Sequence, residues 1–248
     1  MTTNRLTGAT TRPRDTDRNA ILVLIGLIWT GVLMGFGGQI LSQPDRVYLP
    51  IVHVHAFVFV GWLVLLTVQA LLARRGRVDL HRRLGLVGAA LACIMVILGP
   101  ATAIMVDAAK FAAKGRAPAF LAVQLSDMVA FTLLVGAGLV MRARPQAHKR
   151  LILMGTLYIS DAGFSRWLGD AAEALVGGGQ GFTPTWASLY LPNVVLVLAF
   201  GAYELAAHRR LHPAYLAAAG LTFSLQIMAT ALLLSPAWAS FSLKLIGH

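Results

Sequence analysis

Long apolar runs alternate with short polar connections along the whole chain. Seven runs are long enough, at about 20 residues, for a helix to cross the roughly 30 Å hydrocarbon layer of a bilayer. Their approximate bounds are 20–41, 52–73, 84–106, 119–141, 151–168, 186–207 and 215–234. Because lipid offers the backbone no hydrogen-bond partner, each run must be a helix. The pattern predicts an all-α fold, a polytopic integral membrane bundle of about seven transmembrane helices.

Composition agrees with this pattern and excludes several classes of function. Only 12% of the 248 residues are charged, against about 25% in soluble domains. The net charge of +11 does not indicate nucleic acid, because the Lys and Arg residues form short clusters between apolar runs. Cys93 is the only cysteine, which excludes an intrachain disulfide and a thiolate cluster. The chain carries no phosphate-binding glycine loop and no dinucleotide fingerprint, so we expect no nucleotide partner.

Basic residues in the connections predict the orientation. With the N-terminus in the cytoplasm, fifteen Lys and Arg residues lie inside and five lie outside. The exception is the third connection, which would place Lys110, Lys114 and Arg116 outside. We therefore expect an N-in, C-out protein of the cell inner membrane. Residues 1–19 are then a basic cytoplasmic tail without a cleavable signal peptide, 20–234 the transmembrane domain and 235–248 a short C-terminal tail.

Glycine and proline add local expectations. Gly31 and Gly35 form a Gly-x-x-x-Gly face suited to close helix packing. Pro100 predicts a kink in the third helix, because it removes one backbone donor.

A short internal repeat links two parts of the chain. Residues 77–88, RVDLHRRLGLVG, align without gaps on residues 144–155, RPQAHKRLILMG. The alignment matches His81 with His148, Arg83 with Arg150 and Gly88 with Gly155. Both copies lie at an inner connection that enters an outward-running helix. The repeat predicts two helical hairpins in parallel orientation, 52–106 and 119–168.

Three segments carry a resemblance: HVHAFVFVGWLVLLTVQ, GRVDLHRRLG and RPQAHKRLILMG followed by SRW. Together they resemble a large group of uncharacterised bacterial multi-pass membrane proteins with His-x-His-Ala, Leu-His-Arg-Arg-Leu-Gly and His-Lys-Arg-Leu elements in this order. The resemblance covers roughly residues 50–167. It implies membrane location and a helical fold, and no established activity. The histidines at helix ends also give the chain a looser architectural similarity to cytochrome b561-like bundles.

Several polar residues fall inside the outer halves of the predicted helices. Ionisable groups within a bilayer are costly and mark functional sites by default. The expected polar cavity, open to the outside, is lined by His55, Gln69, Asp127, Tyr158, Asp161 and Arg166. A transition metal would be held by His53, His55, Asp127 and Asp161. The two histidines can share a ligand only if their helix begins at or after His55.

Two other readings of this polar set stay open. The same groups could relay protons. Alternatively, Arg166 pairs with Asp127, Asp161 or Asp170 and only locks helices together, while His53 and His55 are interfacial residues.

A second set of histidines lies on the inner side. His81 and His148 come from different helices at the same depth, as bis-histidine ligation of haem b requires. Arg82, Arg83, Lys149 and Arg150 would then neutralise propionates or a quinone head. The alternative is that these basic clusters bind anionic lipid and set topology. His208 and His212 are a weaker signal of the same kind.

Two functional hypotheses follow, with a third as their alternative. The first is a redox component that holds haem or a transition metal. The second is a proton-coupled transporter of small solutes. The third is an accessory subunit without catalysis, and neither enzymatic activity nor homo-oligomerisation is decided by the sequence.

Overall fold

The structure, a computed structural model, describes residues 13–248 and the side chains from residue 17 onward. Every regular element within these residues is helical. The elements are α1 (Pro13–Val32), the π-helical turn η1 (Leu33–Gly37), α2 (Gly38–Ser42), α3 (Pro50–Arg74), α4 (Val78–Lys114), α5 (Leu121–Val140), the 3₁₀ turn η2 (Met141–Ala143), α6 (Pro145–Ile159), α7 (Asp161–Leu175), α8 (Phe182–His208), α9 (Pro213–Leu233) and α10 (Pro236–Leu245). The first twelve residues of the expected tail 1–19 lie outside the described part, and α1 begins before residue 20.

Within the described residues 13–248, six helical stretches are long and apolar enough to cross a membrane. They are Asp17–Ser42, Pro50–Arg74, Val78–Lys114, Leu121–Ala143, Phe182–His208 and Pro213–Leu233. The predicted count of seven is not confirmed, because the expected fifth span, 151–168, is two helices that meet at Ser160. α6 and α7 have 15 residues each, and each is about 22 Å long at 1.5 Å per residue, short of the hydrocarbon layer.

A side chain from α8 stabilises the break between α6 and α7. Asn193 Nδ2 donates to the backbone oxygens of Leu157, at 2.8 Å, and Tyr158, at 3.2 Å. The Ser160 hydroxyl donates to the same Leu157 oxygen at 2.6 Å. Non-helical backbone at membrane depth is tolerated only where protein or water satisfies it. Asn193 and Ser160 supply that satisfaction here.

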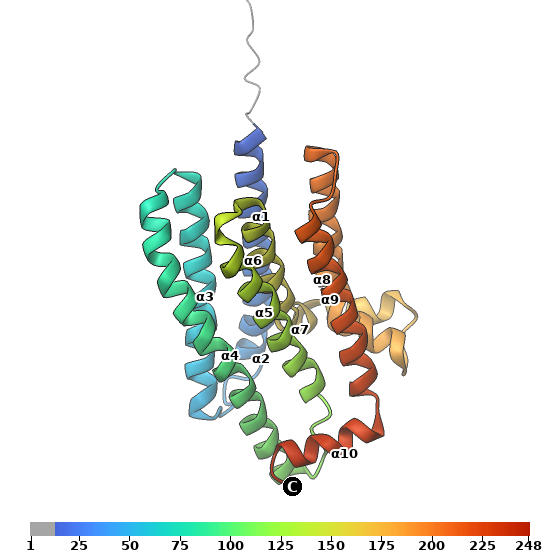
Figure 1. Cartoon of the computed structure of the whole chain (residues 1–248). Coiled ribbons are helices and arrows are strands. Elements are labelled where there is room, and N and C mark those ends of the chain that lie inside the picture. The colour runs from blue at the N-terminus through green and yellow to red at the C-terminus, as the bar shows by residue number, and fades with distance from the viewer. Residues whose placement is uncertain (1–12) are drawn as a thin grey trace, which may run out of the picture.

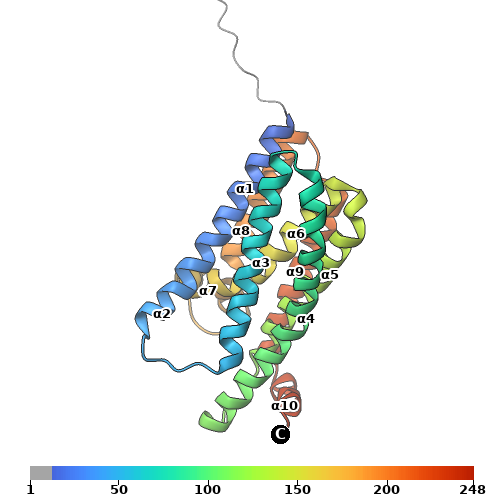
Figure 2. The same cartoon turned by 90° about the vertical axis from the view of Figure 1, so that its left-hand side faces the viewer.

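The basic connections gather at one end of the bundle. Figures 1 and 2 place the start of α1, the α3–α4 turn, the α5–α6 connection and the α8–α9 connection at this end, with α10 and the C-terminus at the opposite one. We call it the basic end; it is formed by the start of α1 and residues 74–83, 141–150 and 208–213. The arrangement agrees with the charge distribution, which predicts that this end faces the cytoplasm.

The core is centred on α5 and α6, and α3 is peripheral. Of the membrane-span windows, 50% is buried in Leu121–Ala143 but only 11% in Pro50–Arg74. Trp62 and Leu63 are the buried residues of α3. Trp62 Nε1 donates to the Thr156 hydroxyl of α6 at 3.0 Å, which ties the peripheral hairpin α3–α4 to the core.

The glycine face of α1 and η1 packs against α7, as the Gly-x-x-x-Gly spacing predicted. A Cβ added at Gly35 would lie 2.0 Å from the Gly163 backbone oxygen, and one at Gly31 would lie 2.5 Å from the Phe164 ring. The third predicted span is one helix, α4, which continues through Pro100 to Lys114, and the kink at Pro100 stays a prediction.

Candidate functional site

His81 and His148 face each other at the basic end. Each is the fourth residue of its helix, His81 in α4 and His148 in α6. Their ring centroids are 6.4 Å apart and their planes are inclined by 86°. The structure thus brings together the two histidines that the internal repeat matched.

Both imidazoles are held in the same way. His81 Nδ1 lies 3.2 Å from the backbone oxygen of Gln69, and His148 Nδ1 lies 2.7 Å from that of Gly138. A carbonyl oxygen can only accept, so each Nδ1 must carry the proton and donate. This tautomer leaves the Nε2 lone pair of each ring for a ligand.

The charged residues next to this histidine pair differ from the expectation. Arg150 and Lys149 are already engaged, Arg150 by Glu204 and Lys149 by Asp17. Arg82 and Arg83 are exposed. Of the four cations expected to bind an anionic group of a cofactor, Arg82 and Arg83 therefore are the two still available to do so.

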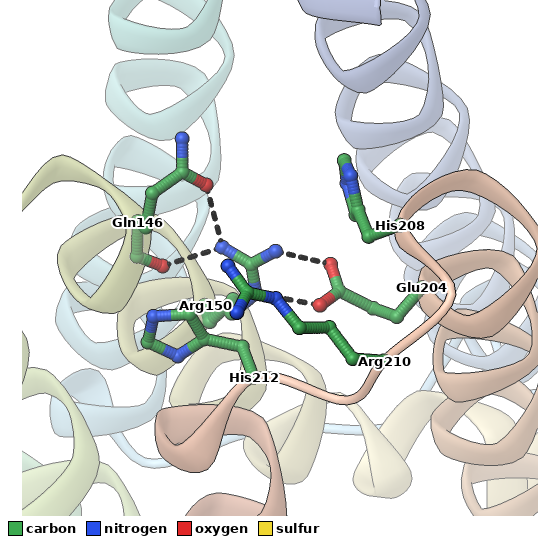
Figure 3. A pocket seen from close by; sticks show the side chains of 6 residues that line it. All are labelled: Gln146, Arg150, Glu204, His208, Arg210 and His212. Carbon is green, nitrogen blue, oxygen red and sulfur yellow. Dashed lines mark hydrogen bonds and ion pairs between the residues drawn. The ribbon is translucent and has the colours of Figure 1, made fainter.

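A buried ion pair, Arg150 with Glu204, lines a pocket of about 320 Å³ at the basic end (Figure 3). Arg150 donates from Nε to Glu204 Oε2 at 2.8 Å and from Nη2 to Oε1 at 2.6 Å. Its Nη1 donates to the backbone oxygen and Oε1 of Gln146. Such a bidentate pair links α6 and α8 at the basic end.

His208 and His212 line the same pocket, and each has a local partner. His208 Nε2 lies 2.8 Å from Asp17 Oδ1, to which the Tyr203 hydroxyl also donates. His212 caps α9 by accepting from the Ala214 backbone N–H at 3.0 Å. Partial burial, together with the nearby Arg150 guanidinium, lowers the pKa of His212 and favours the neutral form that can accept.

Asp127 and Asp161 form a second cluster in the bundle interior, which we call the carboxyl pair. Asp127 lies on α5, and Asp161 is the first residue of α7 beyond the break. Both are buried, with 9% and 3% of their surface exposed. Their carboxyls are close enough to interact electrostatically. Tyr158, whose hydroxyl is 2.7 Å from that of Ser126, is beside them.

The outer histidines do not join the carboxyl pair. α3 begins at Pro50, before His55, so His53 and His55 point to different sides of the helix. His55 stacks on Phe59 with 3.9 Å between ring centroids. Over residues 13–248, no three His, Cys, Asp or Glu side chains are grouped so that they could hold a metal ion. The structure thus does not assemble His53, His55, Asp127 and Asp161 into one metal site.

Arg166 and Gln69 also lie differently from the expected cavity lining. Arg166 is exposed, donates to Gln39 Oε1 at 3.1 Å and to the Ala162 oxygen, and lies over the Phe36 ring. No carboxylate in the described part of the chain is within ion-pair distance of it, so the expected pairing with Asp127, Asp161 or Asp170 is not present. Gln69 is half-buried, and its backbone rather than its side chain meets His81.

Sequence reasoning missed three residues that organise these sites: Asp17, Asn193 and Glu204. Glu204 had a usable signal, since it is the one carboxylate in the apolar run 186–207, where a charge needs a partner. Asn193 in the same run had a weaker signal of the same kind.

Comparison of the chain with protein-family models, with curated proteins and with solved structures gives no match.

Proposed function

We propose that this protein is a haem-binding redox component of a membrane, with His81 and His148 as the two axial ligands. The observation that carries the proposal is the facing imidazole pair with both Nδ1 atoms fixed on backbone oxygens. Two metal–nitrogen bonds of about 2 Å and two ring radii add up to about 6 Å between ring centres. The observed 6.4 Å fits that sum.

The donor set fits haem better than a bare metal ion. Protein sites for zinc and similar ions use three or four side-chain ligands. The histidine pair has no third His, Cys, Asp or Glu beside it among residues 13–248. Haem needs only axial ligands from the protein, because the macrocycle supplies the other four nitrogens.

The residues around the pair have distinct roles in this proposal. The carbonyl oxygens of Gln69 and Gly138 orient the imidazoles and increase their basicity as ligands. Exposed Arg82 and Arg83 are placed to neutralise propionates. Bound haem would supply one-electron chemistry. The position at the basic end favours exchange with an electron carrier near that membrane surface.

The test is an ultraviolet-visible spectrum of the detergent-purified full chain, produced with ample haem, before and after dithionite. We expect a Soret band and a reduced α-band at one haem per chain. His81→Ala and His148→Ala should each lower the haem content at least several-fold, because one imidazole alone holds haem weakly.

His53→Ala is the matched control, since His53 is exposed on α3 and distant in sequence from both ligands. It should keep the wild-type spectrum. A folded, colourless wild-type protein, or a Soret band that survives in the His81→Ala, His148→Ala double variant, would overturn the proposal.

A further inference from the structure

The carboxyl pair sits where the helix breaks, deep in the protein. Asp161 is the first residue of α7. It follows Ser160, at the helix break that Asn193 stabilises by hydrogen bonds to the backbone. Asp161 thereby lies close enough to Asp127 of α5 for the two carboxyls to interact. Discontinuous membrane helices of this kind frequently build ion and proton sites near the middle of the bilayer.

Among residues 13–248, no cation forms an ion pair with either carboxyl. Arg166, one and a half turns along α7, acts on both carboxyls only from a distance, and its guanidinium is exposed and bonded to Gln39 and Ala162. Two ionised carboxylates in contact within a low-dielectric interior would repel strongly. Binding of a proton or of another cation removes this repulsion.

The oxygens of the pair also lack donors. Within the described residues, neither carboxyl oxygen of Asp161 and not Asp127 Oδ1 accepts a side-chain hydrogen bond. Two neighbouring carboxyls can form a hydrogen bond with each other only when one of them is protonated, because an ionised carboxylate can only accept.

The side chains around the pair are mostly neutral. The titratable and charged side chains that face the pair are Tyr158 from α6, Tyr190 from α8 and Arg166 from α7. Tyr158 is bonded to Ser126. Tyr190 is fully buried, and its hydroxyl has no partner in the part of the chain that the structure describes. Among the described residues of α9, which packs on α5 and α6, the buried polar residues Thr222, Gln226 and Thr230 do not titrate, and the hydroxyl of buried Tyr215 donates to the Val197 oxygen.

We propose that the carboxyl pair is an intramembrane proton-binding site in which Asp127 and Asp161 share one exchangeable proton. The site does not depend on haem at the histidine pair. It would serve the proton-coupled transporter predicted as the alternative function, and equally a redox protein that moves protons with electrons.

Infrared spectroscopy of the purified chain at neutral pH tests the site directly. A protonated carboxyl has a carbonyl stretch that an ionised one lacks, and this stretch shifts in D₂O if the proton exchanges. We expect such a band in the wild type. It should be lost in the Asp127→Asn, Asp161→Asn double variant and shifted or lost in each single variant, because an amide can donate to the remaining carboxylate.

Asp170→Asn is the control, because Asp170 lies on α7 but is exposed, and it should leave the band unchanged. If the Asn variants do not fold, Asp127→Glu and Asp161→Glu replace them. These variants keep both acids and should shift the band without abolishing it.

A wild-type band that is absent, or one that survives the double Asn variant, overturns the proposal. So does a band that appears only when Na⁺ is replaced by choline, since the site then holds sodium. Loss of haem alone would leave the band in place, so the two proposals fail separately.

Discussion

The hairpins α3–α4 and α5–α6 share one short motif at the start of their second helices, but those helices lie in different environments. In both, a histidine in the first turn of the second helix donates to a backbone oxygen of the preceding helix. Beyond this histidine they diverge. Ten of the 15 residues of α6 are buried, against six of the 37 residues of α4. α6 also ends at Ile159, two residues before Asp161 of the carboxyl pair.

The difference separates what the repeated motif specifies from what its neighbours add. The motif places one imidazole at the basic end of each hairpin, whether the helix is central or peripheral. Burial then decides the roles of the matched residues. Beyond the histidine, a matched residue is exposed or loosely packed in α4, and its counterpart in α6 is buried. Three pairs of substitutions test this separation.

The largest effect is expected from the matched arginines. Arg150→Ala leaves Glu204 buried without its partner, and loss of one member of a buried pair costs about 3–5 kcal/mol. Arg83→Ala removes an exposed side chain and should change stability by less than about 0.5 kcal/mol. Thermal unfolding in detergent measures both. Equal effects of the two substitutions would show that burial does not distinguish the hairpins.

The matched glycines should give an intermediate effect. A Cβ at Gly155 would lie 2.9 Å from a Val135 methyl group and 3.1 Å from Leu134 Cβ, so Gly155→Ala should destabilise by about 1–3 kcal/mol. At Gly88 the nearest atom is a Leu65 methyl at 3.4 Å. Gly88→Ala should be neutral or stabilising by up to about 1 kcal/mol, since alanine favours the helix. A stabilising Gly155→Ala in the same unfolding assay would contradict the close packing of α6 on α5.

The smallest effect is expected at the contact between the hairpins. Thr156→Val removes the acceptor of the Trp62 indole and should cost about 1 kcal/mol, with the buried N–H left unpaired. Thr67→Val, which removes the partner of half-buried Trp29, is the control and should cost less. Fluorescence-detected unfolding follows both. No difference between Thr156→Val and the wild type would mean that the α3–α4 hairpin is held by other contacts.

Much of the fold could be predicted from the apolar runs alone. Six of the seven expected spans are long apolar helices, and the glycine face found its close partner. The break in the fifth could not be predicted, because Ser160 and its neighbours contain no proline and the break depends on Asn193 from another helix. A tertiary hydrogen bond of this kind leaves no local signature in the sequence.

The candidate site was predictable where it repeats. Alignment of His81 with His148 fixed their equal depth, and the parallel hairpins brought them together. The polar set of His55, Asp127, Asp161 and Arg166 was not brought together as a whole. Helical spacing placed these residues in the outer halves of the predicted helices, but it could not say which helices are neighbours or which faces meet. α3 proved peripheral and Arg166 turned outward.

The central claim is that His81 and His148 bind one haem iron together. Electron paramagnetic resonance of the oxidised, haem-loaded protein tests it most directly, since the spectrum reports both axial ligands at once. Two imidazoles whose planes are inclined by 86° predict a low-spin signal of high anisotropy. His148→Ala should convert the remaining signal to high spin. A high-spin spectrum in the wild type, or a low-spin spectrum unchanged in both single alanine variants, would contradict the account.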